Sequence, residues 1–93
     1  MKNNKEFNKI IKTICNEGRA NIILLLHSSK TEMCVNEISL AVEMSQSLTS
    51  HQLGYLESRD LICGHRVGKT ICYKLCDNSI TKKTVKVIKT LTN

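Results

Sequence analysis

The chain has 93 residues, the length of one small domain, and 14 Lys and Arg against 8 acidic residues give it a formal net charge of +6. This excess of positive charge suits a polyanion or an anionic membrane surface, with plain solubility as the alternative. No apolar run approaches the ~18–20 residues of a transmembrane helix, and no signal-peptide core follows Met1. We therefore expect a cytoplasmic protein with no membrane partner.

Five cysteines are spread along the chain: Cys15, Cys34, Cys63, Cys72 and Cys76. Their number is odd, their spacing is irregular, and they include no C-x-x-C pair and no zinc-finger spacing with histidine. In a cytoplasmic protein such cysteines are mostly reduced thiols. We expect no disulfide framework, no structural metal site and no cofactor.

Helical periodicity dominates the N-terminal half. Lys5–Cys15 places apolar residues on one helical face, and Asn16 can cap a second helix over about Glu17–Ser28. Residues 22–26 make that second helix apolar almost all round, so we expect it to be buried centrally.

Two further helices follow after a short loop. The third covers about Val35–Glu43, and Ser45 can cap a fourth that runs to about Arg59. Gly54 inside the fourth helix costs about 1 kcal/mol relative to Ala. We expect close packing or a close approach of backbone at Gly54 to offset that cost.

A hairpin and a last helix complete the chain. Leu61–Arg66 and Ile71–Cys76 read as strands joined at Gly68, and residues 77–79 can cap a helix that carries Ile80, Val85, Ile88 and Leu91. The order α-α-α-α-β-β-α predicts a mainly α fold with a small β-hairpin wing, a winged helix-turn-helix over residues 1–93. The helix-turn-helix spans about 35–59 and the wing about 61–76. The terminal helices, about 5–15 and 79–91, each carry an apolar stripe and should pair in a homodimer.

Several segments, taken in this order and spacing, resemble the ArsR/SmtB family of bacterial winged-helix repressors over roughly residues 14 to 80. They are residues 16–19, Glu37-Ile38, residues 45–47 and 50–53, and, in the wing, Leu61-Ile62 and residues 66–75. The Glu-Gly-Arg at 17–19 is more similar to the persulfide- and redox-sensing branch than to the arsenic and zinc sensors. The resemblance implies a homodimer that represses from a palindromic operator and is released by an inducer.

The resemblance also implies that the fourth helix enters the major groove of double-stranded DNA. Its candidate contact residues are Gln46, Ser47, Thr49, Ser50, His51 and Gln52. The wing candidates are His65, Arg66 and Lys69, placed on phosphates or in the minor groove. Alternatively, His51 makes only a phosphate or local contact, and the wing charges are simply solvated.

Two positions depart from the family pattern. Leu48-Thr49 reverses the usual order of a small residue followed by an apolar one, which suggests a different helix rotation or packing. Glu43 stands at a turn where glycine is usual, and it is strained if its φ is positive.

The sensing residues of the family are incomplete in this chain. Cys34 matches the first cysteine of the thiol metal box but Asn36 replaces the second, the last helix has no histidine, and Leu24 replaces the second-helix cysteine of the persulfide branch. Cys34, at a helix start that can lower a thiol pKa, is the best candidate sensor thiol, followed by Cys15. Both can equally be inert small hydrophobic residues, as can the wing cysteines.

Other functions find less support in these residues. An enzyme is disfavoured because the chain has no Gly-rich phosphate loop, no H-E-x-x-H and no Cys–His pair with an orienting group. The alternatives to a repressor are a winged-helix module for protein–protein contact and a constitutive DNA-binding protein without a ligand.

Overall fold

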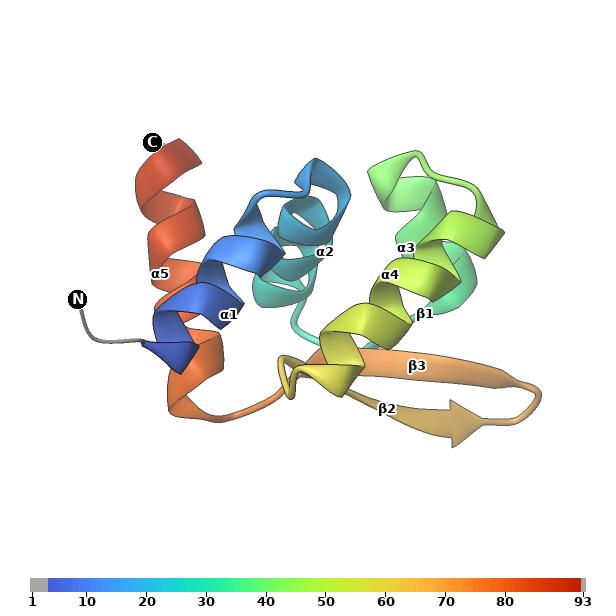
Figure 1. Ribbon diagram of the computed structural model, residues 1–93. Helices are drawn as coiled ribbons and strands as arrows, with labels where there is room; N and C mark the ends of the chain where they lie inside the picture. Colours follow the sequence, from blue (N-terminus) through green and yellow to red (C-terminus); the bar gives the residue numbers. More distant parts are fainter. Residues whose placement is uncertain (1–3, 93) are drawn as a thin grey trace.

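The computed structural model describes residues 4–92 (Figure 1). Its elements are α1 Lys5–Ile14, α2 Glu17–Ser28, β1 Met33–Cys34, α3 Val35–Val42, α4 Gln46–Ser58, β2 Ile62–Val67, β3 Thr70–Leu75 and α5 Ser79–Thr92. The molecule is elongated, 47 × 25 × 24 Å, with α1 packed against α5 at one end and the β2–β3 hairpin reaching toward the other (Figure 1). No helix within residues 4–92 is long and apolar enough to cross a membrane.

Side-chain caps start the helices where the sequence predicted them. The Asn16 Oδ1 atom accepts a hydrogen bond from the Arg19 N–H at 3.0 Å, and the Ser45 Oγ atom accepts one from the Leu48 N–H at 3.0 Å. Asn78 does the same for the N–H of Thr81 at 2.9 Å. Each cap satisfies a backbone N–H that has no partner inside its helix, so the predicted helix starts are confirmed.

The sheet has three antiparallel strands in the order β1-β3-β2. The hairpin pairs Ile62 with Leu75 and Val67 with Thr70, and Gly68 takes a φ of 64° in the turn between the strands. β1 was not predicted, because two residues are too short to show an alternating pattern. With β1 added, the predicted winged helix-turn-helix fold is confirmed.

The core gathers around α2. Ile22 and Ile23 are fully buried, and they belong to a cluster with residues of α3, α4, the wing and α5: Ile38, Leu53, Leu56, Leu61, Ile62, Tyr73, Val85 and Ile88. The central position predicted for α2 is therefore confirmed. This cluster fixes α4 and the wing relative to each other.

The sequence predicted backbone strain at Glu43 and close packing at Gly54, and only the first is found. Glu43 takes the left-handed conformation, with φ 57° and ψ 46°, so the turn does impose a backbone state that costs an L residue about 1–2 kcal/mol. Close packing at Gly54 was a wrong expectation. A Cβ atom added there would meet nothing within 4 Å, because Gly54 lies on the exposed side of α4.

The expectation of reduced, unpaired cysteines was also wrong. Cys34 is disulfide-bonded to Cys72, and Cys63 to Cys76, with Cα–Cα separations of 3.8 and 5.6 Å. Cys15 is the free cysteine of the described residues. The strand register brings these pairs together, since β1 sets Cys34 opposite Cys72, and sequence spacing does not reveal such pairing.

Candidate nucleic-acid interface

The helix-turn-helix is built from α3, a short turn and α4. The α3 helix follows its N-cap residue Cys34, whose N–H donates to Glu37 Oε1 at 2.9 Å, and it ends before the left-handed Glu43. The Met44 N–H then donates to the Ser39 carbonyl at 3.1 Å, and Ser45 caps α4. These contacts set the angle at which the first turns of α4 leave the body of the protein.

The outward side of the N-terminal half of α4 is polar. Four of the six predicted contact residues lie there and are exposed: Gln46, Ser47, Ser50 and His51. Together they present amide, hydroxyl and imidazole groups, which match hydrogen-bonding groups on base edges and phosphates. We call these four residues the reading face.

The other two predicted contact residues, Thr49 and Gln52, point inward. Thr49 is fully buried and Gln52 is 6% exposed, on the same side of α4 as Leu53 and Leu56. The sequence spacing could have predicted this burial. Each of the two residues lies four positions before one of these buried leucines, and residues four apart share a helix face. Leu48, by contrast, is 44% exposed, so the reversed Leu48-Thr49 order places a hydroxyl in the core. Thr49 and Gln52 therefore support the helix from inside and are not on the reading face.

Gln52 belongs to a polar network that ties α4 to the first two helices. Its Oε1 accepts from Arg19 Nη1 at 3.2 Å, and its Nε2 donates to Asn16 Oδ1 at 3.2 Å. Arg19 Nη2 also donates to the Lys12 carbonyl at 2.7 Å, and its guanidinium lies 4.1 Å from the centre of the Tyr55 ring. From the sequence, Arg19 stood out only as part of a family segment, but in the structure it holds α4 against the first two helices.

The wing carries its predicted contact residues on the outside. His65, Arg66 and Lys69 are all exposed. His65 Nε2 lies 3.0 Å from Glu32 Oε1, whereas Arg66 and Lys69 make no ion pair within residues 4–92. The charges of Arg66 and Lys69 are therefore not neutralised by an acidic side chain of the described residues and can pair with a polyanion.

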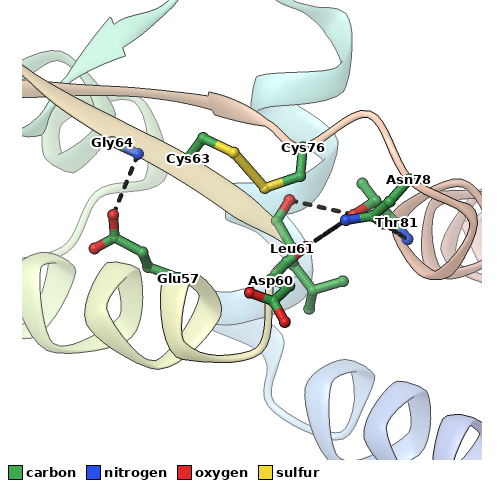
Figure 2. Close-up of a disulfide and its surroundings, with 8 residues drawn as sticks. All are labelled: Glu57, Asp60, Leu61, Cys63, Gly64, Cys76, Asn78 and Thr81. Atoms are coloured by element: carbon green, nitrogen blue, oxygen red, sulfur yellow. Dashed lines mark hydrogen bonds between the residues drawn. A yellow bond between two sulfur atoms is a disulfide. The ribbon is translucent and has the colours of Figure 1, made fainter.

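A glycine and a tyrosine fix the wing against the end of α4. The ring of Tyr73 lies over Gly64 on the facing strand, where an added Cβ would come within 2.6 Å of Tyr73 Cε2. The Gly64 N–H donates to Glu57 Oε2 of α4 at 3.3 Å (Figure 2). Burial, and next the nearby Glu57 carboxylate, raise the pKa of Tyr73 above its ordinary value.

The segment between α4 and β2 also touches the start of α5. Asn78 Nδ2 donates to the Asp60 carbonyl at 2.8 Å, and the Thr81 hydroxyl lies 3.4 Å from the same oxygen (Figure 2). Asp60 itself is left-handed, with a φ of 62°. The end of α4, the wing and the start of α5 therefore meet at one junction.

The structure contradicts one of the two predicted sensor thiols, Cys34, and leaves the other, Cys15, a free cysteine. Cys34 is bonded to Cys72 and carries no titrating thiol, because the sheet brings its partner opposite. Cys15 is exposed, and its Sγ donates to the Lys12 carbonyl at 3.2 Å. Within residues 4–92, no group of three or more His, Cys, Asp or Glu is placed to hold a metal ion.

The chain is similar to a known protein family and to several of its members. Residues 16–62 match the family described as "Bacterial regulatory protein, arsR family". A transcriptional repressor SmtB homolog of Synechocystis is 38% identical over 52 residues, which are 56% of this chain and 39% of that protein. The chain thus spans about half or less of the length of the first curated relatives it matches.

Two solved structures share the fold over nearly the whole chain. HlyU from Vibrio cholerae has a TM-score of 0.79 at 24% identity, covering 95% of this chain and 94% of that one. A homodimeric winged helix-turn-helix DNA-binding domain, Mb0332 from Mycobacterium bovis, has a TM-score of 0.72 at 22% identity, covering 94% and 75%. The matched segment 16–62 is half of the chain and includes α3, the turn and the reading face of α4. The chain belongs to the arsR family of bacterial regulatory proteins.

Proposed function

We propose that this protein is a sequence-specific DNA-binding transcriptional regulator, a homodimeric repressor of the ArsR/SmtB type that binds a palindromic operator. The observation that carries the proposal is the exposed polar reading face of α4 beside a wing with exposed Arg66 and Lys69. A capped helix with a polar outer face fits the major groove, while cationic side chains on a hairpin suit the flanking phosphates. The repressor named among the relatives agrees with this role.

The reading face divides into two kinds of contact. Gln46 can pair through two hydrogen bonds with adenine, and the hydroxyls of Ser47 and Ser50 suit base edges or phosphates. The imidazole of His51 can donate a hydrogen bond to a base edge or to a phosphate, and it can accept one from a base edge. In the wing, His65, Arg66 and Lys69 contact phosphates or the minor groove, which adds affinity without sequence information.

The dimer in this proposal forms through the terminal helices. On α1, Phe7 and Ile11 are 58% and 42% exposed, and on the neighbouring α5, Leu91 is 70% exposed. A second copy related by a two-fold axis would cover these apolar side chains and present two reading faces to two half-sites. In this role residues 1–93 form one such domain, which acts in the cytoplasm and catalyses no reaction.

The test is fluorescence anisotropy of the oxidised, metal-free protein on DNA from upstream of its own gene. An unrelated duplex of equal length serves as competitor at about physiological salt. We expect Gln46→Ala and Ser50→Ala each to weaken specific binding by about 1–3 kcal/mol where a base contact is lost. Binding that the unrelated duplex removes completely would favour the alternative of a protein-contact module.

The wing needs a separate comparison. We expect Lys69→Ala to weaken binding to all duplexes alike and to lower the salt slope by about one unit. Lys86→Ala, on the exposed side of α5, removes the same charge away from the reading face and should leave the slope unchanged. If Gln46, Ser47 and Ser50 can all become Ala with operator binding unchanged, α4 is not the reading helix.

A further inference from the structure

We propose that the Cys63–Cys76 disulfide is a reversible exchange site for low-molecular-weight thiols and their disulfides, and that its redox state sets the affinity of the wing for DNA. The second part rests on the proposed function above. In the reducing cytoplasm of the proposed function, disulfides are usually transient and redox-sensing. One of the two disulfides lies within the wing, and the other joins the wing to β1. The two disulfides differ in their position in the fold and in their exposure to solvent.

The Cys63–Cys76 pair lies at the junction of α4, the wing and α5 (Figure 2). Cys63 is in β2, and Cys76 directly follows β3 on the way to α5. The Cys76 N–H donates to the Leu61 carbonyl at 3.0 Å, beside the Asn78 contact with Asp60. A covalent bond at this point joins the base of the wing to the segment that leads into α5.

Access separates this pair from the other one. Cys63 is exposed and Cys76 is half-buried, whereas Cys72 is 2% exposed and its partner Cys34 is half-buried. Thiol–disulfide exchange requires an attacking thiolate to reach a sulfur atom. The Cys63–Cys76 bond should therefore exchange first, while Cys34–Cys72 stays closed.

A small cavity adjoins Cys76. It has a volume of about 190 Å³ and is lined by Cys76, the apolar Leu75 and Val85, and the polar His27, Thr81 and Lys82. Pockets for drug-sized ligands are larger, about 300–1,000 Å³. The cavity therefore fits a thiol of about the size of cysteine, with its carbon chain against Leu75 and Val85.

The exchange is balanced in two steps. A small thiolate attacks Cys76 Sγ from the cavity, forms a mixed disulfide, and releases the exposed Cys63 as a thiolate that takes up a proton. A second small thiolate then attacks the outer sulfur of the mixed disulfide and releases Cys76, which is also protonated. Two thiols are oxidised to one small disulfide, and the protein bond takes up two electrons and two protons.

Reduction of the disulfide makes the base of the wing more flexible but leaves the two strands of the hairpin paired. The strand pairs from Ile62–Leu75 to Val67–Thr70 remain, but the link from Cys63 to the α5 segment is gone. The reduced wing must then be ordered when it meets DNA. We expect this ordering to weaken binding by roughly two- to tenfold, the usual cost of immobilising a flexible surface group.

The exchange site is tested on the wild-type protein in a series of cysteine/cystine buffers. Samples are quenched with acid and alkylated, and the modified cysteines are located by peptide mass mapping. We expect Cys63 and Cys76 to open in buffers that leave Cys34 and Cys72 bonded. If the Cys34–Cys72 pair opens first, or both pairs open together, the assigned site is wrong.

The regulatory part is tested by anisotropy on the operator duplex in the same buffers. The Cys63→Ser/Cys76→Ser double variant should show the weaker affinity in every buffer. Cys15→Ser, which removes an exposed thiol outside the wing, should keep the full wild-type response. A double variant that still responds like wild type overturns the switch. Failure of the protein to discriminate its operator in any buffer would refute the proposed function and the switch, while peptide mapping still decides the exchange site.

Discussion

The buried hydroxyl of Thr49 gives the sharpest test of how α4 is oriented. Thr49 is fully buried, and its Oγ1 has no hydrogen-bond partner within the described residues. Leaving a buried polar group unpaired costs about 1–3 kcal/mol. Valine has the same branched shape with a methyl group in place of the hydroxyl, so Thr49→Val should raise the free energy of unfolding by about 1–2 kcal/mol. For a domain of this size, that is a rise in Tm of about 4–8 °C per kcal/mol.

Thr84 of α5 provides a matched control. It is also fully buried in a helix, but its hydroxyl donates to the Ile80 carbonyl at 2.7 Å. Thr84→Val loses that hydrogen bond and should lower the free energy of unfolding by about 0.5–1.5 kcal/mol. The assay is urea unfolding of the oxidised proteins followed by circular dichroism, with equal m values as the check on two-state behaviour.

Two results would refute the reasoning about Thr49. A Thr49→Val protein no more stable than wild type would mean that its hydroxyl is not an unpaired buried group. A tenfold loss of operator affinity with stability retained would place Thr49 on the reading face after all. We expect instead that operator affinity is unchanged.

Three other substitutions test the description of α4 and the wing. Gly54→Ala should stabilise the protein by about 1 kcal/mol in urea unfolding, because its new Cβ meets nothing within 4 Å, and a loss of stability would mean that the site is crowded. Gly64→Ala should destabilise it by about 1–3 kcal/mol, because the Cβ would lie 2.6 Å from the Tyr73 ring, and an unchanged Tm would contradict that contact. Since the pKa of Tyr73 is raised in the folded state, the unfolded chain ionises first, and stability should fall as pH rises above about 10. Tyr73→Phe should lose part of this decline when unfolding is measured across that range, and an identical pH profile would argue against the burial of the Tyr73 hydroxyl.

The sequence was most informative where structure is local. Asn16, Ser45 and the segment 77–79 predicted three helix starts, because a cap is a hydrogen bond between residues three apart. The apolar run in α2 predicted its central burial, and Gly68 predicted the turn of the wing. These features depend on residues that are adjacent in the chain, so the sequence alone is enough to predict them.

Side-chain direction on α4 was predicted only in part. Composition singled out a polar helix, yet polarity alone did not separate the outward Gln46 and Ser50 from the inward Thr49 and Gln52. Gln52 is buried because Arg19 and Asn16, more than thirty residues away, supply its hydrogen bonds. Such long-range partners satisfy the hydrogen bonds of a buried polar side chain, and no local sequence pattern predicts them.

What the sequence by itself determined is therefore the set of helices, the hairpin, the polar character of α4 and the basic character of the wing. Only the tertiary structure decided which α4 residues face outward, that Gly54 is uncrowded, and that β1 exists. It also decided the pairing of Cys34 with Cys72 and of Cys63 with Cys76. The reason is physical: caps, turns and periodicity arise within a few residues, whereas burial, strand register and disulfide partners depend on which distant segments the folded core brings together.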